Sequence, residues 1–95
     1  IRAKRIDDNH GEIVIALRSV GATVQSLAGV GCGCPDLLVG INGRNWLMEV
    51  KDGDKPPSRQ SLTADEVIWH NEWKGKVAIV TSVREAMAAI GAQMM

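Results

Sequence analysis

The chain has 95 residues and a formal net charge of zero, with 45% hydrophobic and 23% charged residues. This composition is ordinary for a globular protein, the length fits one small domain over residues 1–95, and zero net charge is not typical of a strong nonspecific nucleic-acid binder. Because there is no apolar run of about 18 residues and no charged-then-apolar leader, we expect a cytoplasmic protein without membrane association.

The N-terminal third of the chain is predicted to contain a helix and a strand. Residues 9–20 carry apolar side chains at helical spacing, and Gly21 follows them, which is typical of a helix end. Residues 22–28 have β-branched character and are predicted to form a strand. The glycine-rich stretch 29–34 is predicted to be a loop.

A β-hairpin is predicted next. Residues 36–40 and 45–51 are both apolar, and Asn42-Gly43 between them is the strongest short signal for a tight hairpin turn. If these two residues form the turn, Asp36 lies directly opposite Glu49 on the neighbouring strand. Opposed residues of an antiparallel pair share one face, with Cβ atoms about 4.5–5.5 Å apart. The hairpin therefore brings two carboxylates together.

The C-terminal half is predicted to continue with a helix, a strand and a helix. After a polar loop with Pro56-Pro57, the run from Thr63 to Glu66 is a capping box that begins a helix, which Gly75 is expected to end. Residues 76–81 are predicted to be a strand.

Ser82 to Glu85 form a second capping box, and the helix after it should run to about Ile90. The order αβββαβα predicts an α/β fold with a mixed four-stranded sheet flanked by helices. The strand, crossover helix and strand over residues 45–81 should form a right-handed parallel unit.

Lys51 joins the two carboxylates because it follows Glu49 by two residues and so points to the same face of the strand. Burying opposed carboxylates among apolar neighbours is unfavourable unless a cation compensates them. Mg²⁺ suits this role, since one or two carboxylates hold it together with water and phosphate oxygens. The alternative is that Lys51 neutralises Glu49 as a structural ion pair.

The two cysteines, Cys32 and Cys34, are predicted to be reduced thiols in the loop. A disulfide between residues two apart would be strained, and a four-ligand zinc site would need both His10 and His70. A redox or zinc protein is thus one competing hypothesis. A nucleotide-binding module is another, because glycines alternate over residues 29–33, but a strand rather than the required helix follows them.

Pro35-Asp36 followed by Glu49-Val50-Lys51 matches the PD-(D/E)xK nuclease signature. The longer strings at 33–40, 47–53, 56–58 and 62–66 resemble the stand-alone VRR-NUC nucleases of bacteriophages, and this resemblance extends over roughly residues 8–88. It implies a restriction-endonuclease-like αβββαβ core followed by a C-terminal helix. It also implies a metal-dependent DNA endonuclease in the cytoplasm of the host cell, of the kind used in DNA repair.

The resemblance also implies roles for individual residues. Asp36, Glu49 and the Val50 carbonyl would bind Mg²⁺ or Mn²⁺, and Lys51 would act on the attacking water or the phosphate rather than on folding. Glu12, in the first turn of the first helix, matches the helical acidic residue that reaches the metal. The helix dipole alone also favours an acidic residue there.

Three loop residues are weaker candidates for DNA contacts: Lys55, Arg59 and Gln60. Exposed loop residues of these types need no special reason, so a plain solvated loop remains an alternative. Basic residues at the N-terminus could add to such a surface, as an arm made of Arg2, Lys4 and Arg5.

The helix beginning at Thr63 suggests a homodimer. Val67 and Ile68 fall on one side of this helix, while Trp69 and Trp73 share nearly the opposite side. One apolar side should pack on the sheet, which leaves the other for a partner or for the loop after Lys51. A twofold dimer would present two sites to a four-way junction, as the resemblance implies. The alternatives are a flap or nicking nuclease, or a nuclease fold used only to bind DNA.

Overall fold

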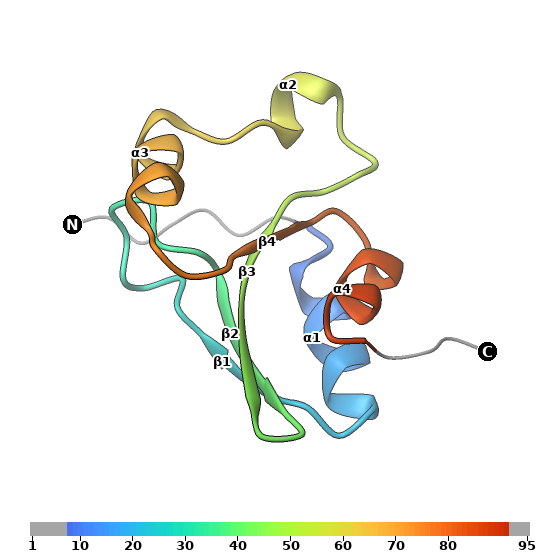
Figure 1. Cartoon of the computed structure of the whole chain (residues 1–95). Coiled ribbons are helices and arrows are strands. Elements are labelled where there is room, and N and C mark those ends of the chain that lie inside the picture. The colour runs from blue at the N-terminus through green and yellow to red at the C-terminus, as the bar shows by residue number, and fades with distance from the viewer. Residues whose placement is uncertain (1–7, 92–95) are drawn as a thin grey trace.

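The computed structural model describes residues 8–91, so the arm with Arg2, Lys4 and Arg5 lies outside the described residues. The four strands lie between helices on both sides (Figure 1). The elements in chain order are α1 (His10–Ser19), β1 (Thr23–Ser26), β2 (Leu37–Ile41), β3 (Arg44–Val50), α2 (Pro57–Gln60), α3 (Ala64–Glu72), β4 (Ala78–Val80) and α4 (Val83–Ala89).

The four strands form one mixed sheet in the order β1-β2-β3-β4, with the first two pairings antiparallel and β3 parallel to β4. Ile41 pairs with Arg44, so the register agrees with the one predicted from the turn. Asn42 and Gly43 both have positive φ, at 53° and 75°, as a tight two-residue hairpin turn requires. The expected α/β fold with a mixed, helix-flanked sheet is confirmed.

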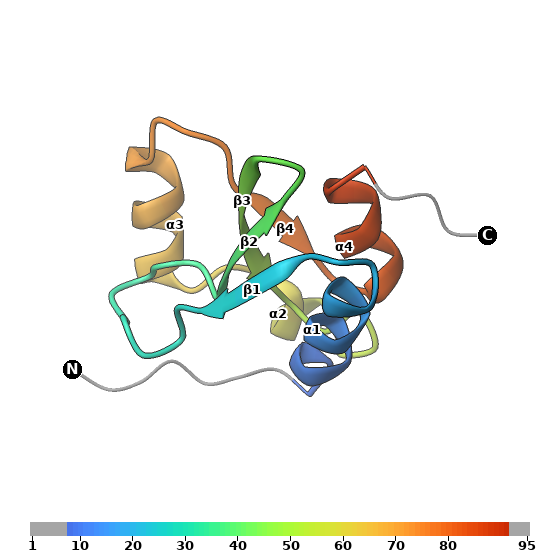
Figure 2. The same ribbon diagram turned by 90° about the horizontal axis from the view of Figure 1, so that it is seen from below.

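The core lies between one face of the sheet and the pair α1 and α4, which pack side by side (Figure 2). Alternate strand residues point into this layer because side chains alternate between the faces of a strand. The fully or nearly fully buried members are Ile13, Leu17, Leu37, Val39, Met48, Val50, Val80 and Ala86. The opposite face is therefore free to carry other chemistry, and α3 lies on that side (Figure 2).

The structure differs from the expected elements in several details of the C-terminal half. The loop after Lys51 contains a short helix, α2, which begins at Pro57 in a position where proline's fixed φ suits a first helical turn. The helix α3 ends at Glu72 with Trp73 as its C-cap, so Gly75 does not end it. The second capping box is incomplete, because Glu85 accepts hydrogen bonds from Thr81 and not from the N-cap.

The orientation of α3 corrects the expectation that one of its apolar sides packs on the sheet. The buried residue of this helix is Glu66, whereas Val67 is 42% exposed, Ile68 56% and Trp73 46%. The Trp69 and Trp73 rings stack on each other with centroids 4.7 Å apart. The inward side of α3 is thus its polar side. No helix within residues 8–91 has both the length and the apolar character needed to cross a membrane.

Candidate active site

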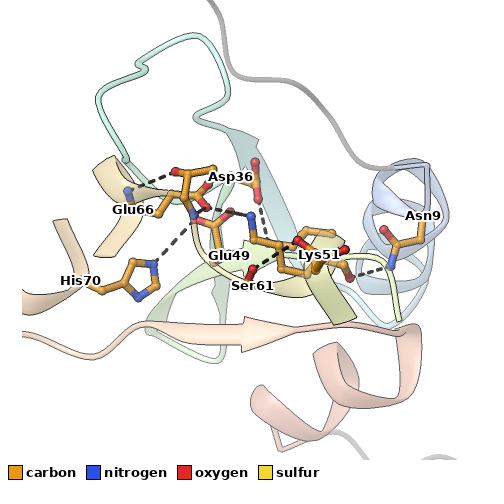
Figure 3. Close-up of polar contacts among 10 residues, drawn as sticks. Asn9, Asp36, Glu49, Lys51, Ser61, Glu66 and His70 are labelled. Atoms are coloured by element: carbon orange, nitrogen blue, oxygen red, sulfur yellow. Dashed lines mark hydrogen bonds and ion pairs between the residues drawn. The ribbon is translucent and has the colours of Figure 1, made fainter. Parts of the chain in front are cut away.

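Asp36 and Glu49 lie where the β2–β3 hairpin ends, on the side of the sheet that faces α3 (Figure 3). Leu37 pairs with Met48, and Asp36 and Glu49 are the next residues along the two strands. Both carboxylates are buried, with Asp36 2% and Glu49 0% exposed. Asp36 Oδ2 accepts a hydrogen bond of 2.7 Å from the Val50 backbone N–H, which fixes its orientation across the two strands.

Lys51 follows directly after the last residue of β3, and it is only 6% exposed. Its backbone N–H donates to the Val80 carbonyl, so the residue is held by β4 as well as by β3. Its Nζ lies 4.0 Å from Glu49 Oε2 and 2.7 Å from Glu66 Oε1. The three residues of the sequence signature therefore lie together, and a fourth charged residue joins them.

Two side chains of α3 reach this cluster, and the sequence reasoning missed both. Glu66 contacts Lys51, and His70, one helical turn later, places Nε2 3.7 Å from Glu49 Oε1. Residues four apart lie on one helix face, so the pair Glu66 and His70 was a detectable polar stripe. The capping box explained Glu66 locally, which concealed its second role.

The N-cap residue of α1, Asn9, also contacts the site, whereas Glu12 in the helix does not. The Asn9 amide donates to the carbonyls of Lys51 and Thr81, at 3.1 and 3.2 Å. This joins the start of α1 to the ends of β3 and β4 (Figure 3). Glu12 is exposed, and its side chain makes no hydrogen bond or ion pair within the described part of the chain. The structure therefore places Glu12 outside the cluster, because the inward face of α1 is taken by Ile13 and Leu17.

The charge balance of this cluster favours a cation. Asp36, Glu49 and Glu66 are buried carboxylates, and Lys51 is the only buried lysine or arginine in residues 8–91. No group of three or more His, Cys, Asp or Glu side chains in that range is arranged to hold a metal. Mg²⁺ needs fewer protein ligands, since one or two carboxylates suffice when water and phosphate supply the rest. Asp36 and Glu49 meet this requirement for Mg²⁺. The described residues do not offer the larger ligand set that a fully protein-ligated zinc ion needs.

Two polar residues of the loop after Lys51 already have partners within the protein. Gln60 donates to the carbonyls of Lys55 and Gly53, at 2.6 and 3.3 Å, so its amide braces the loop. Lys55 forms an exposed ion pair with Asp8 at 2.7 Å, and this hydrogen bond and charge raise the pKa of Lys55. Arg59 is exposed. Lys55 and Gln60 are thus already engaged, while Arg59 extends into solvent.

The cysteines lie in the loop between β1 and β2 and are not joined by a disulfide. Cys32 is exposed and has a positive φ of 55°. Their place in a loop agrees with the expected one.

One solved structure resembles this fold closely. It is described as a VRR_NUC domain, and the superposition has a TM-score of 0.62, with 24% sequence identity, over 88% of this chain and 91% of that one. No protein-family model and no curated protein matches the sequence. At this identity the likeness establishes the fold: a mixed four-stranded α/β sheet flanked by helices, of the VRR_NUC type.

Proposed function

We propose that the protein is a metal-dependent DNA endonuclease that hydrolyses phosphodiester bonds. One observation carries the proposal: the buried carboxylates of Asp36 and Glu49 and the buried ammonium of Lys51 meet at one end of the β2–β3 hairpin. The fold in which they meet is that of a solved VRR_NUC domain. Surplus buried negative charge beside a lysine is the environment that phosphoryl chemistry with a divalent cation requires.

The residues have separable roles in this mechanism. When bound, Mg²⁺ or Mn²⁺ would supply Lewis-acid activation of a phosphate oxygen and of water, with Asp36 and Glu49 as its carboxylate ligands. The Val50 N–H bond holds Asp36 in place, so one of its oxygens is already oriented. The Val50 carbonyl is a further proposed ligand. Lys51 would place its positive charge where the phosphate gains negative charge in the transition state.

We further propose that the protein acts on branched DNA as a homodimer. Val67 and Ile68 on α3 and Trp73 at its C-cap are exposed apolar side chains, and exposed apolar side chains of this size favour partners. Trp73 also lines a cavity of about 560 Å³, together with Leu38, Asn45, Trp46, Leu47, Gly75 and Lys76. Two copies related by a twofold axis would present two sites to a symmetric junction.

The test uses the purified protein and labelled duplex, flap, splayed-arm and four-way-junction DNA, with Mg²⁺, Mn²⁺ or excess chelator. We expect cleavage with either metal and none with chelator. Asp36→Asn should bind DNA without cutting it, and the exposed loop carboxylate gives the matched control Asp54→Asn, which should cut normally. Full cleavage in chelator would contradict the metal role, and DNA binding without any cleavage would favour a binding module.

Sedimentation at micromolar concentration tests the assembly separately. We expect a dimer with a preference for four-way junctions. A monomer that cuts flaps and leaves junctions intact would contradict the branched-DNA proposal while supporting the nuclease.

A further inference from the structure

Glu66 occupies an unusual position for the third residue of a helix. A glutamate there commonly accepts a hydrogen bond from the N-cap backbone at the protein surface. In α3 this bond is present, from Thr63 N–H to Glu66 Oε1 at 2.9 Å, but the side chain is buried and Glu66 is only 2% exposed. The cap explains the bond to Thr63 and does not explain the burial.

The contact of Glu66 with Lys51 accounts for this burial. The same Oε1 atom accepts from Lys51 Nζ at 2.7 Å, whereas the nearest Glu49 oxygen in an ion pair with Nζ is 4.0 Å away. A lysine ammonium sits on a flexible four-carbon stem, so its place in a site depends on the groups that hold it. Here the shorter contact, and therefore the stronger restraint, comes from α3.

The start of α3 is itself fixed against the loop that leads to Asp36. Gly33 has φ of 82°, and a Cβ at this position would lie only 2.3 Å from the Asp65 carbonyl oxygen. The two backbones thus approach as closely as a glycine allows. Glu66 follows Asp65 directly, so this contact links the loop before Asp36 to the residue that holds Lys51.

We propose that Glu66 is a positioning residue of the active site. It holds the Lys51 ammonium beside the Glu49 carboxylate and also caps α3. The inference rests on the proposed nuclease function and adds a residue to it. In this role Glu66 acts through Lys51 and not as a ligand of the metal or the phosphate. Because displacing a catalytic group by about 1 Å can reduce a rate about 10²-fold, loss of this restraint should appear in kcat.

The chain offers a matched control on α4. Glu85 is also the third residue of its helix, accepts from the Thr81 backbone N–H and hydroxyl at 2.7 Å, and is exposed. Glu66→Gln and Glu85→Gln therefore make the same chemical change at the same helix position. A glutamine oxygen can still accept the backbone hydrogen bond in both variants, so both helices should keep their first turn. Glu66→Asp, which keeps the charge and shortens the reach, is the second variant.

The measurement is single-turnover and steady-state cleavage with Mg²⁺ or Mn²⁺. We expect Glu66→Gln and Glu66→Asp to lower kcat about 10- to 100-fold with KM nearly unchanged, and Glu85→Gln to leave both unchanged. In a Lys51→Met background, Glu66→Gln should lower the rate no further, because residues that act as one unit are not additive.

Each outcome decides one of the two proposals. Equal kcat for Glu66→Gln and wild type would overturn the positioning role and leave the nuclease standing. A full multiplicative loss in the Lys51→Met background would also overturn it, since that is the pattern of a purely structural residue. A wild-type protein that cuts no DNA with either metal would overturn the proposed function, and this inference with it.

Discussion

Replacing Lys51 by methionine tests how much the buried ion pair contributes to the fold. The Lys51–Glu66 contact is 2.7 Å long, with the two side chains 8% and 3% exposed, so solvent screens it little. At an effective dielectric constant near 20 the Coulomb attraction at this distance is about 6 kcal/mol, which is an upper bound because desolvation opposes it. Removing one partner of a buried pair typically lowers the free energy of unfolding by about 3–5 kcal/mol.

That loss is large for this chain. Domains of this size have a free energy of unfolding of about 5–15 kcal/mol, so Lys51→Met should lose about a fifth or more of its stability. With a urea m-value of about 1–2 kcal/mol/M, the unfolding midpoint should fall by about 1.5 M or more. Lys51→Met combined with Glu66→Gln should recover part of this, because the second change removes the buried carboxylate that lay closest to the lost ammonium.

The Lys55–Asp8 ion pair is the control, because it has the same contact distance as the Lys51–Glu66 pair but is far more exposed. Lys55 and Asp8 also lie 2.7 Å apart, but their side chains are 35% and 76% exposed. Lys55→Met should therefore shift the midpoint little. The reasoning is refuted if Lys51→Met and Lys55→Met have the same midpoint within error. The sequence alone suggested that Lys51 acts on chemistry rather than on folding, and its burial predicts that it does both.

Three further perturbations follow from the structure. Glu49→Gln should abolish metal-dependent cleavage with circular dichroism unchanged, and residual turnover near the wild-type rate would contradict the metal role. Gly33→Ala should lower both the urea midpoint and kcat, because the alanine Cβ would lie 2.3 Å from the Asp65 carbonyl oxygen and φ at this position is 82°. An unchanged midpoint would show that the backbones at residues 33 and 65 separate easily. Ile68→Lys, at a side chain 56% exposed, should shift sedimentation from dimer to monomer without unfolding the chain, and an unchanged dimer would place the interface elsewhere.

The placement of Asp36 opposite Glu49 could be predicted from local features. The Asn42-Gly43 turn requires positive φ at both positions and so fixes which residues face one another. The apolar runs on either side select the same register, because a slip by one residue would turn buried side chains outward. These constraints act over a few residues, and the observed pairing of Leu37 with Met48 agrees with them.

The sequence by itself therefore determined the order of the elements apart from α2, the hairpin register and the meeting of Asp36, Glu49 and Lys51. Only the tertiary structure decided which side of each helix faces inward. On α3 the apolar periodicity favoured the wrong side. The helix turns Glu66 inward, where it pairs with Lys51, and Lys51 lies 15 residues earlier in the chain. On α1 it is Asn9 that donates to the ends of β3 and β4. Such contacts join segments far apart in sequence, and no local pattern of residues records them.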